Sequence, residues 1–399
     1  MQRRHRNGRV TLVERVERLA GMAEEPFSST MTDLVGEMSN AILADPETKV
    51  VPQYVALAYW MRAAAVKRLA KDFLASIPDD EVLAPRGVAL HLPPTNVDTI
   101  FVYSWALSAL AGNANLVRLP ATLSPQAQSL LRVVSDTLAE AGQAERHLFC
   151  TYEYGGETER EICRRVDLRI IWGGDAKVES VSQIPIRADG LTIGFPDRQS
   201  LTLISAQAYD SADDGACDDL ATRLFNDAYW FDQMGCSSPR LLVWLGDDHE
   251  CRDDLYVRLE KVIRGKNYVA DPAVGMAKLG LANDFLAEGV ATSAQRYSNE
   301  LQVAEVEEPQ AALLRTTGGG FFGDVHVESL DEVRNFVGRK VQTITHFGFG
   351  RNELVKLARS IAGVGGYRIV PVGEALQFET TWDGVPLLSH MTRRIVVRA

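Results

Sequence analysis

The stretch GVALHLPPTNVDTIFVYSWALSALAGNANLVRLP, residues 87–120, decides the fold. It begins with an apolar run, which indicates a strand, and two prolines then indicate a loop. An apolar stretch of helical length follows, and a second apolar run indicates another strand. Residues 124–142 then predict an amphipathic helix with Ser124 as its N-cap and Gly142 as its stop. Residues 166–182 add another strand, a Gly-Gly turn and a helix. This alternation predicts an α/β fold with a parallel sheet.

A second series of the same kind begins near Leu201. Residues 200–209 predict a strand, a long helix follows, residues 240–246 predict the next strand, and residues 330–350 give helix and strand again. We therefore expect three parts. They are N-terminal helices with a first α/β domain at residues 1–200, a second α/β domain at 201–372, and C-terminal strands at 373–399 that pack on the first domain or on a partner subunit.

The residues that precede the first predicted sheet have a different pattern of apolar side chains. Residues 10–74 predict mostly helix, and residues 54–77 carry apolar side chains at helical spacing up to Pro78. The pattern changes at Val82, where we expect the first strands to begin.

The composition fits a globular protein of about two domains. The 399 residues are 46% hydrophobic and 24% charged, and the net charge of −11 argues against a nucleic-acid partner, which usually meets a basic face. Residues 1–10 hold four arginines, but no apolar core follows, so we expect a tag-like tip and no secretory signal. No apolar run approaches the roughly 18 residues of a membrane span.

The cysteines and histidines do not form metal-binding patterns. Five cysteines are widely spaced without a C-x-x-C pair, which predicts reduced thiols in a cytoplasmic protein. Seven histidines include no H-x-x-x-H spacing, so we predict no metal site.

Cys236 is the first candidate for chemistry, because it stands among the smallest residues of the chain. Gly235, Ser237 and Ser238 leave room for an electrophilic carbon and offer N–H groups that could hold an oxyanion. The preceding helix points its C-terminus toward the thiol, which does not favour a thiolate, and no sequence neighbour supplies a base or a cation. The alternative is a small buried hydrophobe at a packed corner.

Two further loops carry polar candidates. Asn96 follows two prolines, and its amide could donate to an oxyanion or could bond to its own backbone in a turn. Arg118, Thr122 and Ser124 lie just past a strand end, where α/β sheets bind ligands. An arginine there suits a phosphate or a ribose, and the alternative is an ordinary solvated arginine.

A glycine pair marks the last candidate. Gly173 and Gly174 join a strand to a helix start, where N–H groups favour a phosphate. No G-x-G-x-x-G fingerprint lies near them. Asp175 could simply cap the helix, and its charge opposes a nearby phosphate.

The order of these signals resembles the aldehyde dehydrogenase superfamily and, more narrowly, the LuxC-type acyl-CoA reductases, which supply long-chain fatty aldehyde for bacterial bioluminescence. The matching pieces span residues 52–394 and are "ALAGNANLVRLP", "IIWGGD", "FDQMGCSSPR", "QTIT", "GYRIVPVGEAL" and "WDG".

The resemblance implies an aldehyde-dehydrogenase-like fold, in which a Rossmann-like domain at residues 1–200 binds a nicotinamide cofactor and the second, catalytic domain at 201–372 carries a cysteine nucleophile. Cys236 matches that nucleophile, and Asn96 with the Cys236 backbone N–H would form the oxyanion site. Arg118 stands where the superfamily usually carries a lysine that contacts the adenine ribose. The cofactor-binding candidates are then Arg118, Thr122, Ser124, Gly173, Gly174 and Asp175.

The chain departs from the superfamily at three places. Hydrolytic aldehyde dehydrogenases carry a water-activating glutamate where this chain has LTIGFPD, residues 191–197, and Asp197 is the nearest carboxylate. No acidic residue after Arg118 would grip a ribose 2′-hydroxyl, which favours NADPH over NADH. GGGFFGDV, residues 318–325, replaces the usual E-x-F-G-P-V.

These observations predict NADPH-dependent reduction of an acyl-CoA or acyl-carrier thioester to an aldehyde through an acyl-cysteine. One alternative is oxidation of an aldehyde to an acid with NAD(P), and another is an inactive acyl-binding or scaffold subunit. The resemblance also implies an acyl-activating synthetase as partner and a homo-oligomer formed through strands such as TRRIVVRA, residues 392–399. Those residues could equally form a strand within the monomer.

Overall fold

Residues 87–120 fold as the sequence predicts. The strand is β2 (Val88–Leu92), the helix is α5 (Thr99–Leu110), and the second strand is β3 (Ala114–Arg118). Every residue of α5 is buried, which explains why its sequence is apolar on all sides.

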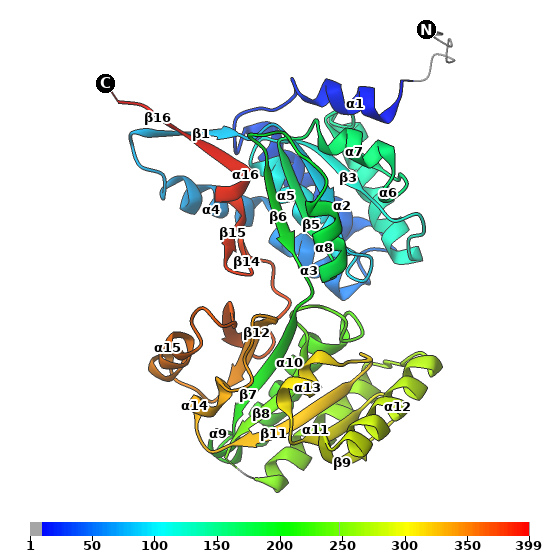
Figure 1. The fold of residues 1–399 in the computed structure, drawn as a ribbon, viewed down its shortest axis with the longest axis vertical. Helices are drawn as coiled ribbons and strands as arrows, with labels where there is room; N and C mark the ends of the chain where they lie inside the picture. Colours follow the sequence, from blue (N-terminus) through cyan, green and yellow to red (C-terminus); the bar gives the residue numbers. More distant parts are fainter. Residues whose placement is uncertain (1–9, 247, 399) are drawn as a thin grey trace. The chain divides into compact units, whose positions relative to one another are not determined.

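The computed structural model describes residues 10–246 and 248–398. The predicted basic tip therefore lies outside the described residues, apart from Val10. The chain divides into two compact units, one running to Pro196 and resuming at Phe378, the other running from Asp197 to Gln377 (Figure 1). Each unit has its own parallel sheet, and each is described by itself below.

The first unit holds a five-stranded sheet with the order β4-β3-β2-β5-β6, and all its strands are parallel. The chain moves outward from β2 through β3 to β4 and then returns to place β5 on the other side of β2. Ligands of such sheets bind at the carboxyl ends of the strands where the order reverses, here β2 and β5. The remaining strands are β4 (His147–Cys150), β5 (Leu168–Trp172) and β6 (Leu191–Phe195).

Helices cover both faces of this sheet, so its strands are buried on both sides. Along β2, Val88, Leu90 and Leu92 join one hydrophobic cluster, while Ala89 joins the cluster on the opposite face. The helices that supply these layers are α1 (Leu12–Leu19), α2 (Ser29–Ala44), α3 (Pro52–Trp60), α4 (Ala63–Leu74), α6 (Pro125–Glu140), α7 (Glu157–Cys163), α8 (Asp175–Ser182) and α16 (Leu387–Met391).

Helices α1 to α4 confirm the predicted helical start, with one difference. The stretch 54–77 is broken after Trp60, and α4 begins at Ala63. A Cβ built on Gly36 of α2 would lie 3.2 Å from the Cβ of Ala63, so the break coincides with a close approach of α4 to α2. Apolar periodicity alone does not reveal such a break, because it continues on both sides.

The C-terminal segment belongs to the first unit. β16 (Thr392–Val396) pairs antiparallel with β1 (Glu81–Pro85) in a separate two-stranded sheet, visible side by side in Figure 1. Val82 and Ile395 are each about half exposed, at 53% and 52%. A second small sheet joins β14 (Thr381–Trp382) to β15 (Val385–Pro386).

The second unit holds a seven-stranded sheet with the order β13-β12-β7-β8-β11-β10-β9, in which only the edge pair β9–β10 is antiparallel. The strands are β7 (Gln199–Ser205), β8 (Pro239–Leu245), β9 (Ala291–Arg296), β10 (Gln302–Val306), β11 (Phe321–Val327), β12 (Val341–Phe347) and β13 (Arg368–Pro371).

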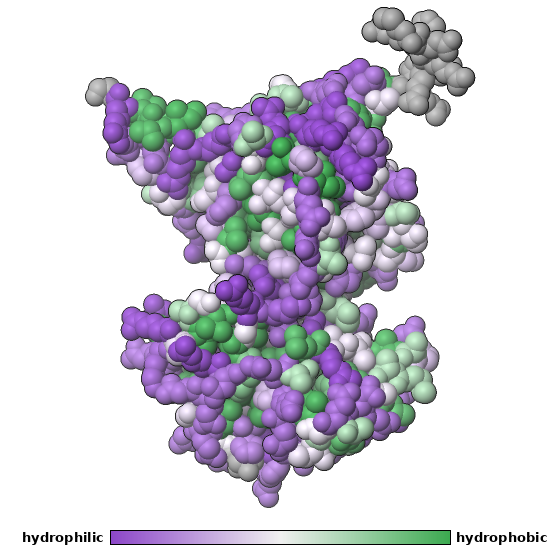
Figure 2. All heavy atoms as spheres, in the orientation of Figure 1, coloured by the Kyte–Doolittle hydropathy of each residue, from purple (hydrophilic) through white to green (hydrophobic). Residues whose placement is uncertain are grey.

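Two hydrophobic clusters fill the two faces of this sheet. The helices are α9 (Ala206–Asp210), α10 (Asp214–Tyr229), α11 (His249–Gly265), α12 (Pro272–Glu288), α13 (Pro309–Leu314), α14 (Leu330–Val333) and α15 (Arg351–Ser360). Figure 2 shows hydrophobic residues at the surface over α12, where Met276 and Leu279 are exposed. Among the described residues, no helix combines the length and the apolar character needed to cross a membrane.

Candidate functional site

The loop that carries Asn96 lies at the carboxyl end of β2, beside the segment that follows β3. Asn96 itself is exposed between β2 and α5. Pro93, Thr95 and Asp98 from this loop line one pocket together with Thr122 and Ser124. The structure therefore brings two predicted cofactor residues next to the predicted oxyanion loop, at the edge of the sheet where ligands bind.

Ser124 has the structural role predicted for it. Its Oγ accepts a hydrogen bond from the N–H of Ala127 at 3.0 Å and so caps α6. The same hydroxyl donates to a carboxylate oxygen of Asp98 at 3.0 Å, and the hydroxyl of Tyr54 donates to that oxygen at 3.1 Å. These bonds tie the start of α6 to the Asn96 loop. A contact of Ser124 with a cofactor remains a prediction.

Arg118 is not an ordinary solvated arginine. It is half-buried at the end of β3, and its guanidinium lies over the rings of Tyr152 and Tyr154, at 5.8 Å and 5.4 Å. One nitrogen donates to the backbone oxygen of Tyr152 at 3.2 Å, and the buried Nε has no hydrogen-bond partner. The Nε atoms of several other arginines lack partners too, so a contact of Arg118 with an anionic or ribose-bearing ligand remains a prediction.

The glycine pair forms the predicted link between β5 and α8. Gly173 has a φ of 155°, and a Cβ there would lie 2.7 Å from the Cδ of Lys177, so the turn requires glycine. Gly174 is the N-cap of α8. Asp175 is the first helical residue, so the expectation that it caps the helix is wrong.

Sequence reasoning missed Lys177, which stands where the strand order reverses. Its Nζ donates to the backbone oxygens of Trp172 at 2.9 Å, Pro93 at 2.8 Å and Leu92 at 3.3 Å. These three bonds fasten the end of β5 to the end of β2 and to the loop before Asn96. Burial lowers the pKa of Lys177 to about 8, so its ammonium form still predominates at neutral pH.

Cys236 lies in the second unit, in a turn between α10 and β8. The helix ends at Tyr229, and the partly exposed Cys236 follows several turn residues later. The carbonyl of Cys236 accepts a hydrogen bond from Ser200 Oγ at 2.8 Å, and this Oγ accepts from the N–H of Thr343 at 3.1 Å. The loop is thereby fixed to both β7 and β12.

Gln233 anchors the same loop and was not singled out from the sequence. Its side chain is fully buried and makes four hydrogen bonds. Its Nε2 donates to the carbonyls of Pro239 and Phe321, each at 2.9 Å, and its Oε1 accepts from the N–H groups of Gly320 and Phe321, each at 3.0 Å. The glutamine therefore joins the Cys236 loop to the GGGFFGDV segment and gives that segment a structural role.

Gln233→Ala is expected to lower the free energy of unfolding by about 3 kcal/mol, because it leaves buried N–H and carbonyl groups without partners. Urea denaturation followed by tryptophan fluorescence measures this loss. Gln295→Ala is the matched control, since Gln295 is an exposed glutamine of the same unit. A change below about 1 kcal/mol in the Gln233 variant would contradict the anchoring role.

A buried carboxylate fixes the neighbouring segment. Asp227 of α10 accepts hydrogen bonds from the N–H groups of Gly373 at 2.7 Å and Ala375 at 3.0 Å. Burial raises the pKa of Asp227 to about 7. Leu376, one residue further, lies 3.6 Å from the position of a Cβ on Gly235. The "PVGEAL" motif thus packs beside Gly235, the residue that precedes Cys236.

The other four thiols are poor nucleophiles. Cys163, Cys217 and Cys251 are buried, and Cys150 is partly buried. Burial raises the pKa of Cys150 to about 11 and that of Cys251 to about 12, and it raises the pKa values of Cys163 and Cys217 as well. No disulfide joins cysteines in the part of the chain that the structure describes, which agrees with the predicted reduced thiols.

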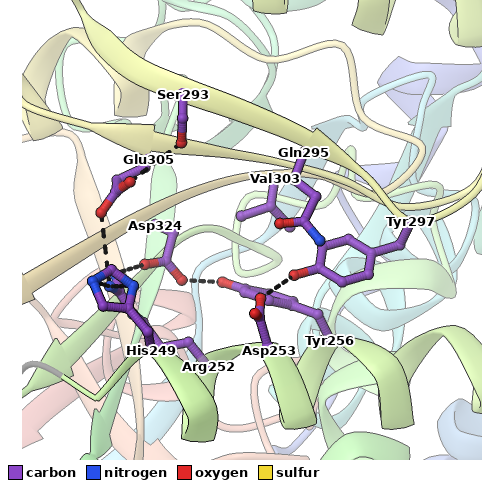
Figure 3. Close-up of a pocket in the computed structure, with 10 residues that line it drawn as sticks. All are labelled: His249, Arg252, Asp253, Tyr256, Ser293, Gln295, Tyr297, Val303, Glu305 and Asp324. Atoms are coloured by element: carbon purple, nitrogen blue, oxygen red, sulfur yellow. Dashed lines mark hydrogen bonds and ion pairs between the residues drawn. The ribbon is translucent and has the colours of Figure 1, made fainter.

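A second pocket lies in the second unit and contains none of the predicted site residues. Figure 3 shows Arg252 and Asp324 pointing toward one another at its base. Asp324 accepts hydrogen bonds from Arg252 at 2.9 Å, from Trp244 at 3.1 Å and from the hydroxyl of Tyr256. The buried charges are compensated within the protein, which indicates a structural network.

One group in the second unit has the residue types of a metal site, although the sequence pattern predicted none. Ligand atoms of Asp210, Asp248 and Cys251 lie within 4.8 Å of one another. The Asp248 carboxylate already caps α11 by accepting from the N–H of Cys251 at 3.0 Å.

The architecture matches solved aldehyde dehydrogenases at low sequence identity. An NAD-dependent aldehyde dehydrogenase of Sinorhizobium meliloti matches with a TM-score of 0.68 and 14% identity, covering 96% of this chain and 85% of that chain. Staphylococcus aureus AldH matches with a TM-score of 0.66 and 13% identity, covering 98% and 95%.

A third solved structure is glyceraldehyde-3-phosphate dehydrogenase of Methanocaldococcus jannaschii complexed with NADP. It has a TM-score of 0.65 and 11% identity, with coverage of 96% of this chain and 92% of that chain. Together these likenesses define an aldehyde-dehydrogenase-like fold. A search of the curated proteins finds no match.

The sequence of the chain also matches a protein family. The model of the LuxC family, described as acyl-CoA reductase, matches residues 71–394, which is most of the chain. The protein belongs to the LuxC family of acyl-CoA reductases, as the sequence motifs predicted.

Proposed function

We propose that the protein reduces an acyl thioester, from acyl-CoA or an acyl carrier, to the aldehyde with NADPH. The family and the fold support an oxidoreductase that acts on aldehyde or acyl groups with a nicotinamide cofactor. The observation that carries the proposal is the Cys236 loop, in which a partly exposed thiol stands among small residues on an anchored backbone.

The carboxylates of the second unit favour reduction over hydrolysis. Asp197 is the nearest carboxylate to the place where hydrolytic relatives carry a water-activating glutamate. It is half exposed and forms an ion pair with Lys340 at 3.5 Å. A carboxylate in that setting is a weak general base, so an acyl-Cys236 intermediate persists long enough to be reduced.

In the proposed mechanism the Cys236 thiolate attacks the thioester carbonyl. Asn96 and the backbone N–H of Cys236 donate to the resulting oxyanion. The oxyanion collapses, the carbon–sulfur bond to CoA or the carrier breaks, and the thiolate leaves with the electron pair. The acyl carbon on Cys236 would accept a hydride from a reduced nicotinamide, which Arg118, Thr122 and Ser124 would hold, and would become a thiohemiacetal. This collapses to free aldehyde and regenerates the Cys236 thiolate.

The first unit supports an anionic cofactor. Arg118 offers a buried Nε that lacks a partner, and Leu119 and Pro120, which follow it in the chain, line the pocket that contains Thr122 and Ser124. Residues 119–124 contain no acidic side chain that would repel a 2′-phosphate, and the carboxylate that lines the pocket, Asp98, accepts hydrogen bonds from Ser124 and Tyr54. These features favour NADPH, and NADH remains the alternative.

The decisive assay incubates the protein with acyl-CoA thioesters of several chain lengths and either NADPH or NADH. We expect cofactor oxidation matched by aldehyde, with a higher kcat/KM for NADPH. Incubation with aldehyde and oxidised cofactor, without added CoA, tests the alternative. Free acid as the main product of that reaction would favour aldehyde oxidation. A folded protein that forms neither product nor an acyl adduct would favour the scaffold subunit.

Assembly and location are part of the proposal. The exposed β1–β16 pair offers free strand edges to a second copy of the chain, which supports a homo-oligomer. A cytoplasmic location is proposed from the five widely spaced cysteines, and an acyl-activating synthetase as partner is proposed by analogy with the family.

A further inference from the structure

Arg240 occupies a bulge at the start of β8, immediately after the loop that carries the thiol. In the pairing of β7 with β8, Ser200 lies opposite Pro239 and Leu201 lies opposite Leu241, so Arg240 is the extra residue between them. A bulge takes one side chain out of the regular alternation of a strand, and bulges are frequent beside active sites.

Backbone oxygens, and no carboxylate, hold this guanidinium. One terminal nitrogen donates to the carbonyl of Leu313 at 3.2 Å, and the other donates to the carbonyl of Arg198 at 3.5 Å. The Nε is buried and lacks a hydrogen-bond partner. Within residues 10–246 and 248–398, no acidic side chain forms an ion pair with Arg240. Its positive charge is therefore not cancelled by direct contact and acts on its surroundings.

Strand β7 connects this cation to the predicted nucleophile. Ser200 holds the carbonyl of Cys236 at 2.8 Å, and Arg198, whose carbonyl holds the guanidinium, lies two residues earlier. Two residues of a strand span only about 7 Å. Burial lowers the pKa of Arg240, while the charge of Asp197 raises it, as would a thiolate at Cys236. Because such an attraction is mutual, the cation also favours the thiolate.

The other charged side chains near Arg240 are engaged with partners of their own. Asp197 is the only carboxylate among those that act on Arg240, and it is paired with Lys340 at 3.5 Å. A terminal guanidinium nitrogen of Arg198 donates a hydrogen bond to the carbonyl of Arg339 at 2.9 Å.

We propose that Arg240 is the cation that holds Cys236 as its thiolate. This inference deepens the proposed function and rests on it for the role of Cys236 as nucleophile. It differs from the expectation that no sequence neighbour supplies a cation. Ser237, Ser238 and Pro239 are uncharged, so Arg240 is the first charged residue after the thiol.

The test is the pH dependence of alkylation of Cys236 by iodoacetamide in the full chain, with the modified peptide identified by mass spectrometry. The rate follows the thiolate fraction. In the native protein we expect a midpoint below the ordinary thiol value of about 8.5. Arg240→Met is expected to raise that midpoint by roughly one pH unit, which slows alkylation at neutral pH about tenfold. Arg240→Lys keeps the charge and is expected to restore most of the shift.

Arg264→Met is the matched control, because Arg264 of α11 is exposed and pairs with Glu260. Its midpoint should equal the native value. A native midpoint at or above 8.5, or equal midpoints in the native protein and Arg240→Met, would overturn the proposal. The midpoint of the native protein tests the proposal by itself, even if the Arg240→Met variant does not fold. Alkylation needs neither acyl-CoA nor nicotinamide, so its outcome is independent of the thioester reduction assay.

Discussion

Cys236→Ser is expected to abolish both acylation of the protein and reduction of acyl-CoA. A serine hydroxyl at this position keeps the size and the loop, but it is far less acidic than a thiol and is a far weaker nucleophile than a thiolate. Two measurements check this: the intact mass after incubation with acyl-CoA, and the aldehyde formed with NADPH. Both signals should vanish together.

Cys150→Ser provides the matched control for this substitution. Cys150 is the other cysteine that is not fully buried, and burial raises its pKa to about 11, so it should carry no acyl group. We expect the Cys150 variant to keep native acylation and turnover. A Cys236→Ser protein that still forms aldehyde at a native rate would exclude the covalent mechanism.

Asn96→Ala is expected to lower kcat roughly 10²–10³-fold, which corresponds to the loss of one oxyanion donor. The amide acts on the charge that develops during attack, so KM for acyl-CoA should change much less than kcat. The alkylation rate of Cys236 by iodoacetamide should stay native, because that reaction forms no oxyanion. Steady-state kinetics and alkylation on one preparation separate these effects.

Asn283→Ala, at an exposed asparagine of α12, is the control for Asn96→Ala and should turn over at the native rate. A loss smaller than tenfold in the Asn96 variant would remove it from the oxyanion site. A parallel fall in the alkylation rate would point instead to a disturbed Cys236 loop.

The sequence predicted the α/β architecture because the signals for that architecture are local. Residues 87–120 show strand, loop, helix and strand in apolar runs of the right lengths, and Ser124 caps α6 with an N–H three residues away. Such short-range patterns survive in the structure because every local preference agrees with the tertiary packing.

The supports of the candidate site could not be predicted, because their partners are distant in the chain. Gln233 bonds to groups near residue 320, and Lys177 reaches the carbonyls of Leu92 and Pro93. The loops that hold Cys236 and Asn96 depend on these contacts. A single sequence reveals that such polar residues exist, but not which backbone groups they meet.

The roles of the asparagines in the family motif "GNAN" could not be predicted from the sequence either. Its two asparagines are buried and hold strands together. Asn113 accepts from the N–H groups of Arg86 and Gly87 at 2.8 Å and 3.1 Å, and Asn115 bonds to His91 at 2.9 Å. The motif supports the start of β3, whereas Arg118 lies at its carboxyl end.

The Gln233 anchor also has a consequence for synthesis of the chain. Cys236 leaves the ribosome well before Gly320 and Phe321, whose N–H groups Gln233 binds across 87 and 88 residues of sequence. Contacts of such long range form late, because closing the intervening loop costs chain entropy. A nascent chain therefore carries the thiol without its ordered surroundings. Its capacity to accept an acyl group should appear only after β11 has been made and paired with β8.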